Sequence, residues 1–413
     1  MEVRVEGPAH GGSCVAHVEG KPLFVHYSLP GELVRVEPRG RRGGAAFAAA
    51  VEVVEPSPDR VAPRCPHFGS CGGCHWQQAA YERQLAIKRE IVAAAWERAG
   101  LRLPPDTPVL GMEEPWRYRI RGEFEATRQG DQVRFGLHRL RSHSVFPVET
   151  CPIHDERIER ALHAFGSAAT ELGLEGAQTL TLTVEPGGSG LLWQLTFRAA
   201  PKRRPPEELA QLVAERLPDL ALLDDSMTLE FWGLSFRVRS DTFVQTNYRQ
   251  MLVLYETALE MLQPSPADQV LDLYSGIGTI GLAVARSAGA VTAVEENPRA
   301  VSLAALAARI NGTRNVHQLP GRVERALKQV RLGQHQAAIL DPPRAGCEPE
   351  ALAELLRLQP DRIVYVSCEP STHARDLAAL VRGGYRVRRA AVVDMFPQTY
   401  HIESVALLER SAG

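Results

Sequence analysis

Short apolar runs broken by turn residues fill the first 55 residues of the chain. The runs are VRV, FVHY, LVRVEP and VEVVEP, with Gly-Gly, Leu-Pro-Gly and Arg-Gly turns between them. Brief alternating segments at this spacing predict the strands of a small all-β barrel. Several prolines and few apolar residues follow in 56–66, which indicates a linker or a domain boundary.

A helix and then a mixed region are predicted after this boundary. Between 76 and 100, apolar side chains recur on one helical face: Tyr81, Leu85, Val92, Trp96 and Ala99. Gly100 then predicts the end of that helix. From about 116 to 235, strand-like runs such as WRYRIRGEFEA and LLWQLTFR are separated by turn residues, which predicts an α+β region.

Apolar strands alternate with Ala- and Leu-rich helices after residue 236. The strands are VLDLYSG, AVTAVEEN, AAILDPPR, RIVYVSC and YRVRRAAVVD. This alternation predicts a doubly wound parallel sheet. We therefore expect a multidomain α/β protein with domains at 1–58, 59–235 and 236–413.

Composition narrows the class of protein without naming a function. The chain has 413 residues, enough for two or three domains, and 44% of them are hydrophobic without any run that could span a bilayer. The first residues lack signal-peptide character, so we expect a cytoplasmic protein whose seven cysteines are ligands, nucleophiles or core thiols. Lys and Arg number 47 against 49 Asp and Glu, which excludes a polybasic protein but permits a local basic face.

A glycine-rich turn after the first strand of the predicted sheet indicates a ligand site. The strand 270–273 runs into Tyr-Ser-Gly-Ile-Gly-Thr, and the glycines let a ligand approach the backbone at a helix N-terminus. Glu295, at the end of the next strand, is placed to hold a ribose hydroxyl. Asp272 inside the strand favours S-adenosylmethionine over a nicotinamide cofactor. The alternative is a tight strand–helix turn without a ligand.

Two further strands deliver reactive groups to the same edge. One ends in Asp341-Pro-Pro-Arg, a carboxylate that either lines the ligand site or caps the following helix. The next delivers Cys368 to the start of a helix, where the dipole favours a thiolate. A thiolate that adds to carbon 6 of a pyrimidine makes carbon 5 nucleophilic enough to take a methyl group. Cys347 is a rival nucleophile, and a buried core thiol is the third interpretation of Cys368.

A separate cysteine motif predicts a metal centre. Cys65, Cys71 and Cys74 have the spacing C-x5-C-x2-C, and Cys151 is available as a fourth ligand. Four thiolates suit an iron-sulfur cluster or a structural zinc ion. The spacing does not match the C-x3-C-x2-C of radical enzymes, so we expect an architectural centre.

Seven sequence stretches together resemble the uracil-5 RNA methyltransferase family. They are GSCVAHVEGKPLFVHYSLPGE, CGGCHWQ, FVQTN, LDLYSGIGTIGL, ILDPPRAG, VYVSCEPST and DMFPQTYHIE, and they cover essentially the whole chain. The resemblance is to members with an N-terminal TRAM barrel and a four-iron cluster, such as the 23S ribosomal RNA uridine-5 methyltransferases. It implies a TRAM or OB-like barrel, a central iron-sulfur and RNA-binding domain, and a Rossmann-like methyltransferase domain.

The resemblance also assigns residues and partners. It implies that a four-iron four-sulfur (4Fe-4S) cluster is held by Cys65, Cys71, Cys74 and Cys151. The pocket for S-adenosylmethionine and the target base would be lined by Gln245, Tyr274, Glu295 and Asp341. Cys368 would be the nucleophile, and Glu403 would remove the carbon 5 proton. The chain departs from the family where Glu369 replaces an Asn, which could raise the thiol pKa, and where LPGRVERA lacks the polar residue that contacts adenine.

The substrate is expected to be a single-stranded loop of RNA. Arg117, Arg119 and Arg121 alternate, so on a strand they would form a basic stripe, continued by Arg134, Arg139 and Arg141. A solvated charged face is the ordinary alternative. We expect a monomer that acts on 23S ribosomal RNA, with transfer RNA uridine-54 as the alternative target. A nicotinamide oxidoreductase and an inactive iron-sulfur RNA-binding protein are the more remote alternatives.

Overall fold

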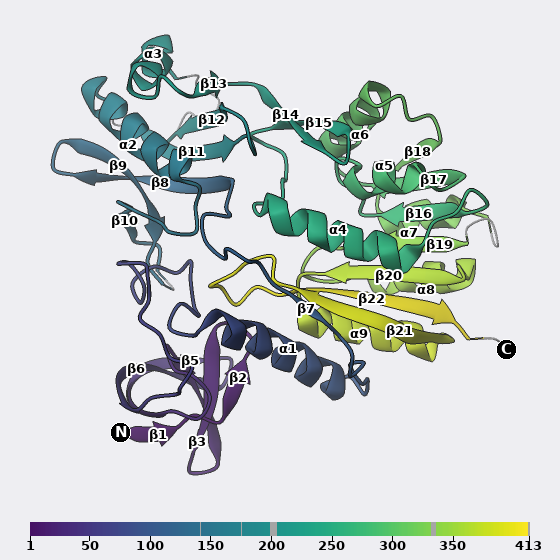
Figure 1. Ribbon diagram of the computed structural model, residues 1–413, viewed down its shortest axis with the longest axis horizontal. Helices are drawn as coiled ribbons and strands as arrows, with labels where there is room; N and C mark the ends of the chain where they lie inside the picture. Colours follow the sequence, from purple (N-terminus) through teal and green to yellow (C-terminus); the bar gives the residue numbers. More distant parts are fainter. Residues whose placement is uncertain (141, 175, 199–204, 332–335, 412–413) are drawn as a thin grey trace. The chain divides into compact units, whose positions relative to one another are not determined.

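The computed structural model describes residues 1–140, 142–174, 176–198, 205–331 and 336–411 (Figure 1). The chain divides into two compact units. Unit 1 comprises Met1–Ile91, Gly111–Asp224 and Phe396–His401, and unit 2 comprises Val92–Leu110, Asp225–Met395 and Ile402–Gly413. The three linear domains stay a prediction.

The N-terminal part of unit 1 is a six-stranded sheet in the order β1-β5-β6-β4-β3-β2. Its strands are β1 (Glu2–Arg4), β2 (Gly7–Ala9), β3 (Ser13–Val18), β4 (Lys21–His26), β5 (Leu33–Arg42) and β6 (Ala45–Glu55). Val25, Leu29 and Val34 are fully buried in its core. The short apolar runs thus form strands, as predicted.

A second sheet in unit 1 carries the mixed α+β region, in the order β10-β9-β8-β11-β12-β13. Its strands are β8 (Arg121–Gln129), β9 (Gln132–His138), β10 (Val145–Pro147), β11 (Ala177–Val184), β12 (Gly190–Phe197) and β13 (Ala221–Leu223). Helices α2 (Glu156–Glu171) and α3 (Glu207–Arg216) accompany it, and Asp155 caps α2 by accepting from the Arg157 amide. The predicted amphipathic helix is α1 (Tyr81–Arg98), and Gly100 follows it with a φ of 77°.

Unit 2 contains an eight-stranded sheet in the order β18-β17-β16-β19-β20-β22-β21-β7. Its strands are β7 (Val109–Leu110), β16 (Gln269–Leu273), β17 (Ala290–Glu295), β18 (Val316–Pro320), β19 (Ala337–Leu340), β20 (Arg362–Ser367), β21 (Tyr385–Val393) and β22 (Glu403–Arg410). A hairpin of β14 (Ser226–Phe231) and β15 (Leu234–Arg239) precedes it. The parallel strands β16, β19 and β20 are almost wholly buried, as expected for strands with both faces covered.

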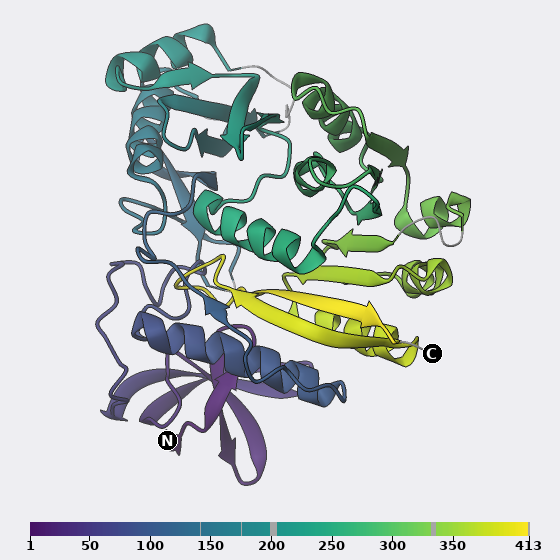
Figure 2. The ribbon, with the colours of Figure 1, turned by 45° about the vertical axis from the view of Figure 1, so that its right-hand side comes forward.

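Helices lie on both faces of this sheet (Figure 2). They are α4 (Tyr248–Leu262), α5 (Thr279–Ala285), α6 (Pro298–Ile310), α7 (Val323–Ala326), η1 (Leu327–Gln329), α8 (Pro349–Leu358) and α9 (Pro370–Arg382). Asn247 and Asn297 cap α4 and α6 through their side-chain oxygens. Within the described residues, no helix combines the length and the apolar character needed to cross a membrane.

The antiparallel strand β22 determines what reaches the carboxyl edge of the sheet. It pairs with β20 so that Ser404 lies opposite Ser367. Because the two strands run in opposite directions, the first residue of β22 lies beside the last residue of β20. Glu403 therefore reaches the edge where the parallel strands β16, β19 and β20 end.

Candidate active site

The loop between β16 and α5 surrounds the predicted cofactor position. Tyr274, Gly276 and Gly278 all have positive φ, at 63°, 56° and 84°. The Gly276 amide donates to Glu295 at 3.0 Å, and the Asn297 amide donates to the same carboxylate at 2.7 Å. The structure therefore ties the glycine loop to the acid at the end of β17.

Two buried carboxyls lie at the ends of neighbouring strands. Asp272 is 2% exposed, and one of its oxygens has no hydrogen-bond partner among the described residues. Burial and the charge of Asp341 raise the pKa of Asp272 to about 7, and burial raises the pKa of Asp341 to about 7 as well. A side chain larger than hydrogen at Gly281 would approach Asp272 to 2.5 Å. Both carboxyls are therefore held where a cation would stabilise their ionised forms.

Tyr255 on α4 connects the remaining predicted residues. Its hydroxyl makes a hydrogen bond with Gln245, while burial and the charges of Asp341 and Glu403 raise its pKa. Gln245, Asp341 and Glu403 therefore gather around one buried phenol. Tyr255 was not predicted from the sequence, because its place on the apolar face of α4 is that of an ordinary core residue.

Cys368 lies directly after β20 and is half-buried. Burial, followed by the charges of Glu403 and Asp341, raises the pKa of its thiol to about 12. Burial and the two carboxylates thus oppose the effect expected of the helix N-terminus, while the charge of Arg344 acts in the same direction as the helix. Glu369 accepts from the amide and hydroxyl of Ser371 and caps α9.

Cys347, the rival nucleophile, is 3% exposed. Its sulfur lies 3.5 Å from the Tyr365 hydroxyl, and its backbone amide donates to Asp376 at 2.8 Å. Burial raises the pKa of its thiol to about 11. A nucleotide base would have to displace this packing to reach the sulfur, so the geometry favours Cys368.

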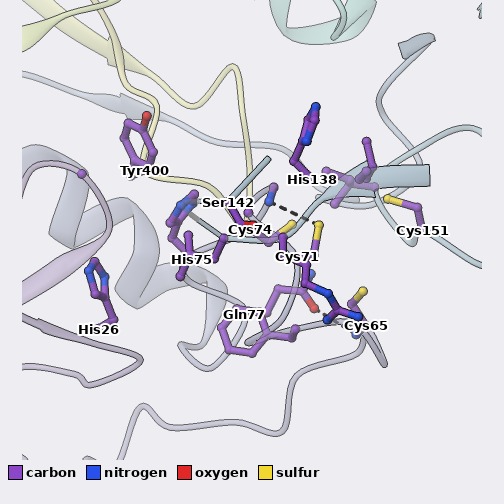
Figure 3. Close-up of a pocket in the computed structure, with 18 of the residues that line it drawn as sticks. His26, Cys65, Cys71, Cys74, His75, Gln77, His138, Ser142, Cys151 and Tyr400 are labelled. Carbon is purple, nitrogen blue, oxygen red and sulfur yellow. Dashed lines mark hydrogen bonds between the residues drawn. The ribbon is translucent and has the colours of Figure 1, made fainter. Parts of the chain in front are cut away.

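The other four predicted cysteines belong to unit 1 and line one cavity of about 1060 Å³, here named the cysteine cavity (Figure 3). Cys65, Cys71 and Cys74 come from the loop before α1, and Cys151 comes from the segment before α2. Burial raises the pKa of Cys74 to about 12 and that of Cys151 to about 11, while the charge of Arg119 opposes both shifts. All four are free thiols.

The cysteine cavity does not resemble the site of a single metal ion. No three His, Cys, Asp or Glu side chains of the described residues are grouped closely enough to hold one ion. The thiols nevertheless interact electrostatically in a ring, Cys65 with Cys71 and Cys151, and Cys74 with Cys71 and Cys151. A multi-iron cluster separates its four ligands more widely than a single zinc ion does.

The predicted arginine stripe is wrong. Arg117 has a φ of 53°, and β8 begins only at Arg121, so the three arginines do not share a strand face. Arg117 pairs with Glu159 and Glu156, and Arg119 packs over Phe396 at 5.9 Å. The side chains of Arg117 and Arg119 therefore contact other residues of the protein.

Arg134, Arg139 and Arg141 were predicted to continue that stripe, and the structure describes the first two. Arg134 donates to Gln132 at 2.8 Å, and Arg139 lies over the ring of Phe146 at 5.4 Å. Arg139 lines the cysteine cavity and remains exposed to solvent. Arg141 lies outside the described residues.

Comparison with known proteins identifies a methyltransferase fold with an appended nucleic-acid module. A model of the tRNA (uracil-5-)-methyltransferase family matches residues 219–411, and a TRAM domain model matches residues 1–37. The solved Pyrococcus abyssi tRNA (uracil-54, C5)-methyltransferase in complex with S-adenosyl-L-homocysteine is similar in fold. It has a TM-score of 0.75 and 21% identity, and the match covers 99% of this chain and 100% of that one.

Full-length relatives show the family. An uncharacterised RNA methyltransferase of Halalkalibacterium halodurans is 34% identical over 445 residues, covering 99% of this chain and 96% of that protein. One of Gloeobacter violaceus is 32% identical over 445 residues, covering 100% and 96%. The chain belongs to the RNA (uracil-5-)-methyltransferase family, whose methyl donor is S-adenosylmethionine. The prediction of a methyltransferase is thereby confirmed over the nicotinamide oxidoreductase alternative.

Proposed function

We propose that the chain methylates carbon 5 of a uridine in RNA, with Cys368 as nucleophile and Glu403 as the base. The observation that supports this proposal is the grouping of Cys368 with Glu403 and Asp341 at the carboxyl edge of the unit 2 sheet. The half-buried thiol and the buried carboxylates have the chemical properties that addition to a pyrimidine and removal of a proton require.

The chain's own residues account for each bond change. The Cys368 thiolate adds to carbon 6 of the uracil, and the resulting enolate is nucleophilic at carbon 5. S-adenosylmethionine would supply the methyl group to carbon 5 from its sulfonium and would leave as S-adenosylhomocysteine, and the carboxyls of Asp272 and Asp341 would attract that cation. Glu403 then removes the proton from carbon 5, the carbon–sulfur bond breaks, and the Cys368 thiolate is restored.

Tyr274, Gln245 and Glu295 are proposed to bind rather than to react. Glu295 accepts from the Gly276 amide of the glycine loop, and its carboxylate would also accept from a ribose hydroxyl. Gln245 has an amide in contact with Tyr255, which suits recognition of the polar edge of a uracil. Removal of the Gln245 amide should therefore weaken binding of the base more than binding of the methyl donor.

A uridine in a loop of 23S ribosomal RNA is proposed as the main target. Phe243, two residues before Gln245, is 79% exposed and suits stacking on an unpaired base. Exposed Arg39, Arg41 and Arg42 line the cysteine cavity in unit 1 and suit phosphates. Transfer RNA uridine-54 is the alternative, since the solved enzyme of similar fold carries that name.

Mass-spectrometric mapping of 5-methyluridine tests the proposed target. Ribosomal and transfer RNA would be compared from cells with and without the gene. Loss of the mark from 23S ribosomal RNA alone is the expected result. Loss from transfer RNA alone would remove the ribosomal assignment and keep the chemistry, whereas no change in either RNA would contradict the proposed function.

A 4Fe-4S cluster is proposed at Cys65, Cys71, Cys74 and Cys151. The support is a set of four free thiols on one cavity, linked in a ring, with cationic Arg119 beside three of them. Such a cluster would cross-link the loop before α1 to the segment before α2, which is an architectural role. A zinc site is the alternative. Metal analysis of protein purified without oxygen would distinguish zinc from an iron-sulfur cluster.

A further inference from the structure

A buried carboxylate on α9 links the helix after Cys368 to the loop after β19. Asp376 is 1% exposed and accepts hydrogen bonds from the Tyr365 hydroxyl at 2.6 Å and from the Cys347 amide at 2.8 Å. Its other oxygen accepts from Arg375 at 2.7 Å. The charge is thus compensated on both sides, and the loop that contains Cys347 is fixed to α9.

Two further side chains of α9 hold the same loop by hydrogen bonds. Arg375 donates to the carbonyls of Ala345 and Cys347, at 3.0 and 3.2 Å, and Thr372 donates to the Arg344 carbonyl at 2.9 Å. Gly346 has a φ of 77°, and a side chain there would come within 2.5 Å of Asp376. The backbone at Gly346 therefore lies so close to the Asp376 carboxylate that only glycine fits at this position.

Cys347 extends this network to the cofactor loop. Its thiol interacts with the hydroxyl of Tyr274, and this interaction contributes to the raised pKa of the phenol. Tyr274 is a non-glycine residue with a φ of 63°, a conformation that persists only where the surroundings hold it. The contact with the buried thiol is an anchor of that kind.

We propose that Asp376 is a positioning residue for the methyl donor: it fixes Cys347, whose sulfur holds Tyr274 in its strained conformation against the cofactor. The inference rests on the proposed role of Tyr274 in binding S-adenosylmethionine. It also gives a structural role to Cys347, which is not the proposed nucleophile. Asp376 never touches the reacting atoms, so it acts on donor binding rather than on the bond changes.

Calorimetric titration with S-adenosylmethionine tests the proposal in the full-length protein. Asp376→Asn should weaken donor binding about tenfold, the usual effect of losing one buried hydrogen bond. Tyr274→Phe should weaken it by a similar factor, and the double variant should bind no more weakly than either single variant. In turnover, KM for the donor should rise while kcat at saturating donor stays near that of the wild type.

Asp268→Asn is the matched control. Asp268 is also a buried carboxylate paired with an arginine, Arg362 at 2.9 Å, but it precedes β16 at the opposite edge of the sheet. The Asp268→Asn substitution should lower the temperature of unfolding and leave donor affinity unchanged. If Asp376→Asn behaves in the same way, or if the effects of Asp376→Asn and Tyr274→Phe simply add, the positioning role is contradicted.

Two cysteine variants decide the question even if Asp376→Asn does not fold. Cys347→Ser keeps an acceptor for Tyr274 and should keep donor affinity within about twofold, whereas Cys347→Ala should lose about tenfold. Equal affinities of the serine and alanine variants would overturn the inference. Absence of donor binding by the wild-type protein would instead contradict the proposed function.

Discussion

The cysteine cavity and the carboxyl edge of the unit 2 sheet place the same side chain in different electrostatic surroundings. Cys71, Cys74 and Cys151 lie within reach of the positive charge of Arg119. Cys368 lies beside the negative charges of Glu403 and Asp341. Burial raises the pKa of the thiols in both regions, and an arginine opposes that rise in each, Arg119 in the cavity and Arg344 beside Cys368.

The difference concerns when a thiol is used as a thiolate. Sulfurs near a fixed cation suit ligands that stay ionised for the life of the protein. Beside Cys368, Glu403 and Asp341 add to the burial that raises the pKa of the thiol, so the ionised form is less favoured there. Each region can be altered separately, and this makes the comparison testable.

The largest expected effect comes from Cys368→Ala. It should lower methylation by roughly 10³-fold or more, because the group proposed to form the bond to carbon 6 is removed. It should also abolish the stable adduct with 5-fluorouridine RNA on a denaturing gel. Cys347→Ser, measured at saturating donor, should keep the adduct. The reverse pattern would show that Cys347 is the nucleophile.

Glu403→Gln should separate methyl transfer from product release. Turnover should fall roughly 10²-fold, because the group proposed to take the carbon 5 proton is lost. A covalent complex with ordinary uridine RNA should then accumulate on denaturing gels. Loss of the nearby negative charge should also lower the pKa of Cys368, so that iodoacetamide alkylates it faster. Unchanged turnover would exclude Glu403 as the base.

In the other region, Cys74→Ala should affect the metal centre and the stability of the fold. Protein purified without oxygen should lose its absorbance at about 400 nm, the region of iron-sulfur charge transfer. The unfolding midpoint should fall by about 5 °C or more, since a cross-link between two segments is lost. Cys14→Ala, a buried thiol outside the cavity, should keep the absorbance. Colourless wild-type protein with stoichiometric zinc would contradict the iron-sulfur assignment.

The smallest effect concerns pH. Asp272 and Asp341 have pKa values raised to about 7, so they bind protons more tightly in the folded than in the unfolded chain. Their contribution to stability therefore falls as pH rises from about 4 to 7 and is constant above that. A bound sulfonium favours the ionised forms, so donor affinity should rise about tenfold from pH 6 to 8. Calorimetry should show proton release, and Asp341→Asn should flatten the profile. A flat wild-type profile would show that neither acid titrates on binding.

The sequence predicted the parallel strands and the residues at their ends, because buried strands followed by glycine or proline are strong local signals. Glu403 was predicted through its motif, but its arrival at the same edge depends on β22 pairing with β20, which no local pattern encodes. Arg117 was misplaced because its positive φ breaks the alternation that the prediction assumed. Asp376 was missed because an Arg-Asp pair within a helix is typical of a solvated surface.

Strand β22 follows β21 in the chain but inserts between β21 and β20. The two earlier strands must therefore leave room for it, and the sheet is continuous only after this non-local pairing forms. Cys368 follows the last residue of β20, and Glu403 is the first residue of β22. The proposed nucleophile and the proposed base are therefore brought together by a pairing between strands that are not consecutive in the chain.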